Sequence, residues 1–142
     1  MNGPQIKDVL ERGYRNYWYY NYEEDYGGYS HYTTCMLTTD AGKVITYNDP
    51  GEGTPPDGNN VVSLTIGDES VDFTDAGTTY NVSTVNYLAA GSCNFNNAGE
   101  TIWPLDQIVA DTQFYVRDSV IDYITAEGTI SPAVEGRLVF LP

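Results

Sequence analysis

The N-terminal residues carry apolar side chains at the spacing of an α-helix. The apolar positions recur every three or four residues and share one helical face: Ile6, Val9, Leu10, Tyr14 and Trp18. Asn2 is suited to cap the first turn, and Pro4 is tolerated within that turn. The pattern predicts a helix over residues 4–20. Gly13 lowers helix stability by about 1 kcal/mol, so the helix can also end there.

After the helix the pattern changes to short segments rich in β-branched residues. Residues 32–39 and 43–47, with an Asp-Ala-Gly turn between them, predict a first hairpin. Residues 61–66, in which apolar and polar residues alternate, and residues 71–74 predict a second hairpin. Residues 48–60 contain no apolar side chain and predict a long exposed loop.

The rest of the chain predicts further strands joined by Asn- and Gly-rich connections. We expect strands at residues 78–85, 86–90, 114–116, 120–124 and 137–141, and a helical turn within 106–111. Many short strands with frequent turns are typical of sandwiches and barrels. The expected fold class is therefore mainly β: an antiparallel β-sandwich or barrel with a short N-terminal helix and aromatic arm. Residues 1–31 would form the helix and Tyr-rich arm, and residues 32–142 the β-rich domain.

The chain is strongly acidic, with a formal net charge of −14. Four of the six basic residues lie in the first 43 positions, so the charged residues after position 43 are almost all acidic. Such a surface repels nucleic-acid phosphates and anionic lipid headgroups. We therefore expect no direct binding to nucleic acid or membrane, and a preference for a basic partner surface.

Targeting signals and cysteine spacing bear on the compartment. The first residues are followed by a polar, charged segment instead of the apolar run of a secretory signal. We therefore expect synthesis in the cytoplasm without a signal peptide. Cys35 and Cys93 lie far apart and show no CxxC spacing. Two buried thiols are the expected state, and a disulfide requires that the fold bring them together.

Aromatic residues are concentrated in one stretch. Residues 14–32 hold eight of the thirteen tyrosines, one of the two tryptophans and the only histidine. Three interpretations are open: contact with a partner protein, packing within the molecule's own core, and stacking on sugar rings. Tyr and Trp dominate protein interfaces, and one short arm cannot bury so many rings internally. We expect a partner-binding surface formed by Tyr14, Tyr17, Trp18, Tyr19, Tyr20 and Tyr22.

Two other groups of residues are candidate sites. His31 and Cys35 would share one face of a strand, but a base and nucleophile also need an orienting group, which the sequence does not identify. Asp49, Glu52 and Asp57 could supply oxygen ligands to a metal ion, although the spacing of a calcium-binding loop is absent. We expect no catalytic residues, no enzymatic activity and no cofactor.

Residues 35–49 carry a resemblance to a known family. They read Cys-Met-Leu-Thr-Thr-Asp-Ala-Gly-Lys-Val-Ile-Thr-Tyr-Asn-Asp. The order of a Met-Leu strand, a short turn, a basic residue, an apolar strand and an acidic loop resembles the head-decoration proteins of tailed phages. The resemblance implies a role in a virion, as a β-domain oligomer that stabilises a capsid lattice while its arm adds contacts to the shell.

We therefore expect a non-enzymatic structural component of a viral particle or similar multi-subunit assembly. It would self-associate or bind a shell protein through its aromatic N-terminal arm. Two alternatives use the same features. A carbohydrate-binding or adhesin-like module would expose the aromatic rings in a groove of the monomer. An acidic inhibitor that mimics nucleic acid would align its carboxylates along one face.

Overall fold

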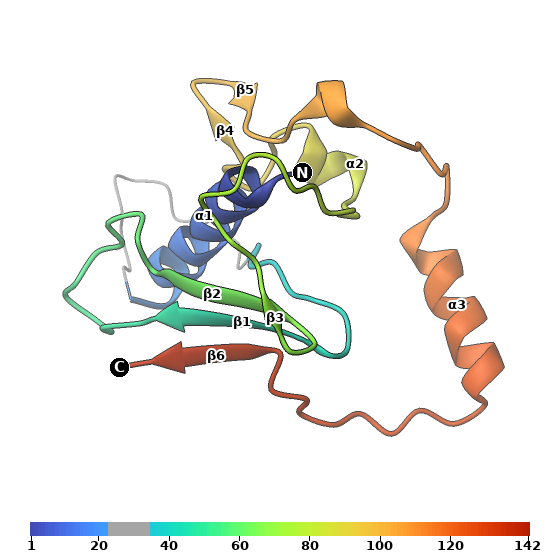
Figure 1. The fold of residues 1–142 in the computed structure, drawn as a ribbon. Coiled ribbons are helices and arrows are strands. Elements are labelled where there is room, and N and C mark those ends of the chain that lie inside the picture. Colours follow the sequence, from blue (N-terminus) through green and yellow to red (C-terminus); the bar gives the residue numbers. More distant parts are fainter. Residues whose placement is uncertain (23–34) are drawn as a thin grey trace.

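The computed structural model describes residues 1–22 and 35–142 and places one long helix at the centre of the molecule (Figure 1). In chain order the elements are α1 (Gly3–Tyr22), β1 (Lys43–Asn48), β2 (Val61–Ile66), β3 (Glu69–Ser70), α2 (Asn86–Ala89), β4 (Asn96–Asn97), β5 (Glu100–Thr101), the 3-10 turn η1 (Leu105–Gln107), α3 (Val116–Glu127) and β6 (Leu138–Leu141).

The main sheet is a mixed one with the strand order β3-β2-β1-β6. Strand β1 pairs with β2 in antiparallel fashion, with Ile45 opposite Leu64, and a bulge lies between Thr46 and Tyr47. On its other side β1 pairs with β6 in parallel fashion, with Ile45 opposite Leu138. Strands β4 and β5 form a separate two-stranded sheet.

The predicted fold class was wrong: the protein has a mixed α/β fold with a short sheet, not a mainly β sandwich or barrel. Two segments account for the difference. Residues 71–85 form turns and irregular backbone, because the Asp72 and Asp75 side chains accept the N–H groups of Thr74 and Gly77 and so close local turns. Residues 120–124 lie in helix α3, where Val116, Val120 and Ile124 follow a spacing of four.

Helix α1 begins as predicted and continues to Tyr22. The Gln5 N–H donates to the Asn2 side-chain oxygen at 3.1 Å, and the Asn2 N–H donates to the Gln5 side chain at 2.9 Å, which is a reciprocal cap. Gly13 does not end the helix. It allows the backbone of another segment to approach, since a Cβ at this position would lie 3.3 Å from the Leu37 nitrogen.

The main core forms where the predicted apolar stripe of α1 meets one face of the sheet. Ile6, Leu10, Tyr14 and Trp18 pack with Ile45, Tyr47, Val61 and Leu64. A second, smaller core lies on another side of α1, where Val9 packs with Phe95 and Trp103. Helix α1 therefore joins the sheet to the turn-rich unit of α2, β4 and β5 (Figure 1).

The predicted hairpins were only partly right. Strand β1 pairs across the long loop with β2, and the described residues 35–40 that precede it are not in a strand. Strand β2 does turn back tightly, but onto Glu69–Ser70 instead of residues 71–74. Residues 86–90, predicted as a strand, contain the short helix α2. In the described part of the chain, no helix is both long and apolar enough to cross a membrane.

Candidate functional site

The six aromatic residues predicted to bind a partner lie in α1 and differ in exposure. Tyr14 and Trp18 are fully buried in the main core, and Tyr19 is 6% exposed. Tyr17 and Tyr22 are half-buried and pack against the same core. Tyr20 is 56% exposed. Packing within the molecule, one of the open interpretations, therefore accounts for most of these rings. Tyr20 stays a predicted contact residue.

The buried rings hold the loop after β1. The Tyr14 hydroxyl donates to one Asp49 oxygen at 2.9 Å, and the Tyr22 hydroxyl donates to the other at 3.4 Å. The Trp18 Nε1–H donates to the Gly51 carbonyl at 3.1 Å. Burial, together with Asp49, raises the pKa of Tyr14 far above its usual value. These contacts fix the beginning of the loop on α1.

The three acids considered as metal ligands do not form a site. Asp49 accepts hydrogen bonds from tyrosines, and Asp57 accepts from the Asn59 N–H at 2.8 Å within a local turn. Among residues 1–22 and 35–142, no three His, Cys, Asp or Glu side chains are grouped so that they could hold a metal ion.

The expected pair of buried thiols was wrong, and the alternative that the sequence left open is present: Cys35 and Cys93 form a disulfide. The bond lies beside the second core, where both residues pack against the cluster of Val9, Phe95 and Trp103. The fold brings the cysteines together because both segments pack on α1, which the sequence spacing does not reveal. Cys35 therefore has no thiolate to act as a nucleophile. His31 lies outside the described residues.

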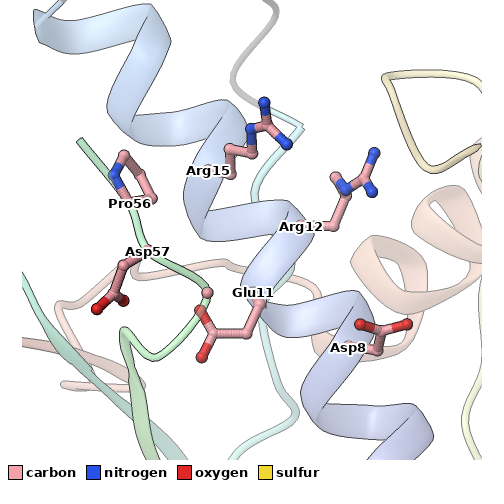
Figure 2. A pocket seen from close by; sticks show the side chains of 7 residues that line it. Asp8, Glu11, Arg12, Arg15, Pro56 and Asp57 are labelled. Atoms are coloured by element: carbon pink, nitrogen blue, oxygen red, sulfur yellow. The ribbon is translucent and has the colours of Figure 1, made fainter. Parts of the chain in front are cut away.

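A hollow of about 250 Å³ lies between α1 and the loop at residues 56–58 (Figure 2). Its lining carries both signs of charge: Asp8, Glu11, Arg12, Arg15, Pro56, Asp57 and Gly58. Figure 2 shows Arg12 and Arg15 projecting to one side of the helix and Glu11 extending toward the loop that carries Asp57. The charged groups therefore do not converge on a common point.

Two of the charged side chains that line the hollow, Glu11 and Arg12, make structural contacts with other elements. Glu11 accepts the N–H groups of Asn60 and Val61 at 3.1 and 2.8 Å. Arg12 donates to the carbonyls of Asn94 and Asn96 at 2.7 and 2.9 Å, and burial foremost lowers its pKa. Glu11 thus holds β2 on the helix, and Arg12 holds the β4–β5 unit. The residues that line the hollow therefore hold elements of the fold together.

A surface that sequence reasoning missed lies in residues 105–136, here called the outer segment. Every residue in it is exposed, and in Figure 1 helix α3 stands away from the body on two long connections. Its large apolar side chains include Val109 at 90%, Phe114 at 82%, Tyr115 at 72% and Val134 at 100% exposure. Single exposed apolar residues are common in folded chains, but so many large ones exposed in one segment are unusual for a monomer.

Helix α3 gathers apolar residues on one side. Successive residues turn by about 100°, so that Val116, Val120, Tyr123 and Ile124 share a face while Asp118, Asp122 and Thr125 lie opposite. The helix ends at Gly128, which has φ 70° and donates to the Ile124 carbonyl at 3.0 Å. The spacing of four and the following glycine were the signals that could have identified this helix.

The chain was compared with known proteins. No family model matches it, and neither a curated protein nor a solved structure matches it.

Proposed function

We propose that this protein is a non-enzymatic structural subunit of a multi-subunit assembly, such as a viral particle, and that it contacts copies of itself through the outer segment. One observation carries the proposal: the outer segment leaves the body of the molecule and exposes nearly all of its large apolar side chains. A monomer in water gains nothing from this arrangement, because apolar surface is stabilised by burial.

The exposed area is of the size that a subunit contact requires. The outer segment exposes Leu105, Ile108, Val109, Phe114, Tyr115, Val116, Val120, Ile121, Tyr123, Ile124, Ile130 and Val134. Together these side chains present on the order of 1,000 Å². A typical specific interface buries about 800 Å² on each partner. The outer segment alone could therefore supply one side of an interface.

The disulfide and the resemblance at residues 35–49 support a particle over an intracellular complex. Disulfides persist in oxidising surroundings, which include virion surfaces, and are rare in the reducing cytosol. The Cys35–Cys93 bond would therefore form when a particle leaves the cell. The resemblance to phage head-decoration proteins points to the same kind of assembly.

The proposal is tested by the solution mass of the purified chain, measured by light scattering over a range of concentrations. We expect a mass that rises to a defined multiple of 15.7 kDa. The double variant Val120→Ser/Tyr123→Ser should shift this transition at least tenfold in concentration, because it removes apolar area from the face that α3 presents to the contact. The matched control is Asp118→Glu/Thr125→Ser on the opposite face of α3, which keeps the charge of the chain and should leave the transition unchanged.

Both variants should fold normally, since α3 contributes no buried residue. A wild-type chain that stays monomeric at every concentration overturns the proposal. An oligomer that Val120→Ser/Tyr123→Ser leaves intact overturns the assignment of the contact to α3.

A further inference from the structure

Strand β6 is the only element after η1 that returns to the body of the molecule. The outer segment before it has no half-buried or buried residue, whereas Leu138 packs against the main core. The backbone of β1 binds β6 along its length: the Ile45 N–H donates to the Arg137 carbonyl at 2.9 Å, and the Asp49 N–H donates to the Leu141 carbonyl at 2.6 Å.

The site that receives β6 belongs entirely to the body. Phe140 stacks on Tyr17 of α1 and Tyr47 of β1, with ring centroids 5.1 and 5.7 Å apart. Arg137 donates to the Thr39 carbonyl at 2.9 Å. The contacts of β6 therefore depend on the edge of β1 and the end of α1, and not on the outer segment that delivers the strand.

We propose that β6 is exchanged between copies, so that β6 of one chain pairs with β1 of a second copy. This inference rests on the proposed function, since it names how the contact between copies is made. Every hydrogen bond and ring contact of β6 is the same in the exchanged form, because the second copy offers an identical β1 edge. Exchange of an identical element is a low-cost route to a dimer.

The outer segment is long enough to reach a neighbour. An extended chain spans about 3.3 Å per residue, so residues 108–115 and 128–137 each cover roughly 25–35 Å. This is comparable to the diameter of a compact body of about 100 residues. The body of a second copy, placed against the first, lies within that distance.

Exchange also explains the exposed apolar residues. In an exchanged dimer two outer segments run between the same two bodies, and the apolar faces of the two α3 helices can pack together about the twofold axis. Each chain then buries area that the closed monomer leaves in water. This gain in apolar burial offsets the entropy lost on association. The occupant of the α3 surface is therefore a second copy of this chain.

The test uses cysteines at positions that face each other across β1 and β6. Thr46 and Val139 are register partners. A chain carrying Thr46→Cys is co-expressed with a differently tagged chain carrying Val139→Cys. The purified oligomer is then treated, without reductant, with methylene bis-methanethiosulfonate, the shortest reagent of its kind. If β6 is exchanged, a covalent link forms in every dimer that contains one chain of each kind and in no dimer of two identical chains.

Three controls make the result specific. The single-chain variant Thr46→Cys/Val139→Cys must become cross-linked in either arrangement, which shows that the two positions can react. Each single variant expressed alone reports any linkage between identical positions. Ser63 lies opposite Thr46 on β2, about two strand spacings or roughly 10 Å from Val139, so a Ser63→Cys chain should not link to the Val139→Cys chain.

The outcomes separate the inference from the function on which it rests. An oligomer in which the double variant is linked only within one chain, with no heterodimer from the mixed chains, overturns the exchange and leaves the proposed function standing. A monomer at all concentrations overturns both. A heterodimer that forms equally with the Ser63→Cys chain also overturns the exchange, because the linkage then does not depend on strand register.

Discussion

Two buried tyrosines show that burial alone does not determine how much a residue contributes to the stability of the fold. Tyr14 and Tyr47 stack with ring centroids 5.2 Å apart, and both are fully buried. The Tyr14 hydroxyl donates to Asp49. The Tyr47 hydroxyl has no hydrogen-bond partner among the described residues. An unpaired buried hydroxyl is costly, whereas a paired one adds stability.

The two rings therefore predict opposite effects of the same substitution. Tyr14→Phe should lower the free energy of unfolding by about 1–2 kcal/mol, because it leaves the charged Asp49 without its closest donor. Tyr47→Phe should leave it unchanged or raise it by about 1 kcal/mol. Urea denaturation followed by circular dichroism measures both. Equal losses from the two substitutions would contradict this account.

The same tyrosines predict loss of stability in alkali. Burial raises the pKa of both Tyr14 and Tyr47 far above the usual value near 10. The pKa of each tyrosine is higher in the folded state than in the unfolded state. The contribution of the two tyrosines to the free energy of unfolding is therefore complete below about pH 10 and is lost as the pH rises further. In an absorbance titration, a late step of phenolate formation should coincide with loss of the circular dichroism signal. Ionisation of all thirteen tyrosines in a folded chain would refute this prediction.

At the scale of elements, the sequence predicted those whose residues have one buried face. Helix α1 and strand β2 were found because their apolar spacing matches the core on one side. The partner of β1 was missed, since pairing across a long loop leaves no local signal. Helix α3 was read as a strand because its β-branched residues favour strands in isolation.

The sequence showed which residues could form a contact surface, but not which of them are exposed. The aromatic stretch drew attention to α1, but periodicity shows which side chains share a face and not what covers that face. Trp18 and Tyr20 are alike in sequence chemistry, yet one is fully buried and the other exposed. The outer segment was missed for the converse reason: apolar residues such as Phe114 and Val134 look the same in a sequence whether they are buried or exposed.

The disulfide is an element-scale contact with a measurable effect on stability. It closes a loop with a sequence separation of 58. In the chain-entropy model such a loop contributes about 4 kcal/mol, and native disulfides typically contribute 2–4 kcal/mol. Cys35→Ser/Cys93→Ser should lower the free energy of unfolding by that amount in urea denaturation. A reductant should shift the wild type equally and the variant not at all. Equal midpoints for both chains would show that the bond adds nothing.

The proposed association between copies would act against the charge of the whole molecule. Copies that each carry a formal charge of −14 repel one another. Raising the ionic strength from about 0.01 M to about 0.15 M shortens the screening length from about 30 Å to about 8 Å. Salt should therefore lower the concentration at which the light-scattering mass rises. A mass that falls with added salt would instead indicate that ion pairs between copies hold the assembly together.

The parallel pairing of β1 with β6 has a consequence for how the protein is prepared. Strands β1 and β2 are close in sequence, whereas β6 is distant, so β6 should dock late in refolding. During that interval the edge of β1 is unpaired and can accept a strand from any chain nearby. If exchange occurs, the dilution at which refolding takes place sets the initial proportion of closed and exchanged molecules. Later concentration of the sample changes this proportion only as fast as β6 detaches from β1, so two preparations of one sequence differ in their state of assembly until each has reached equilibrium.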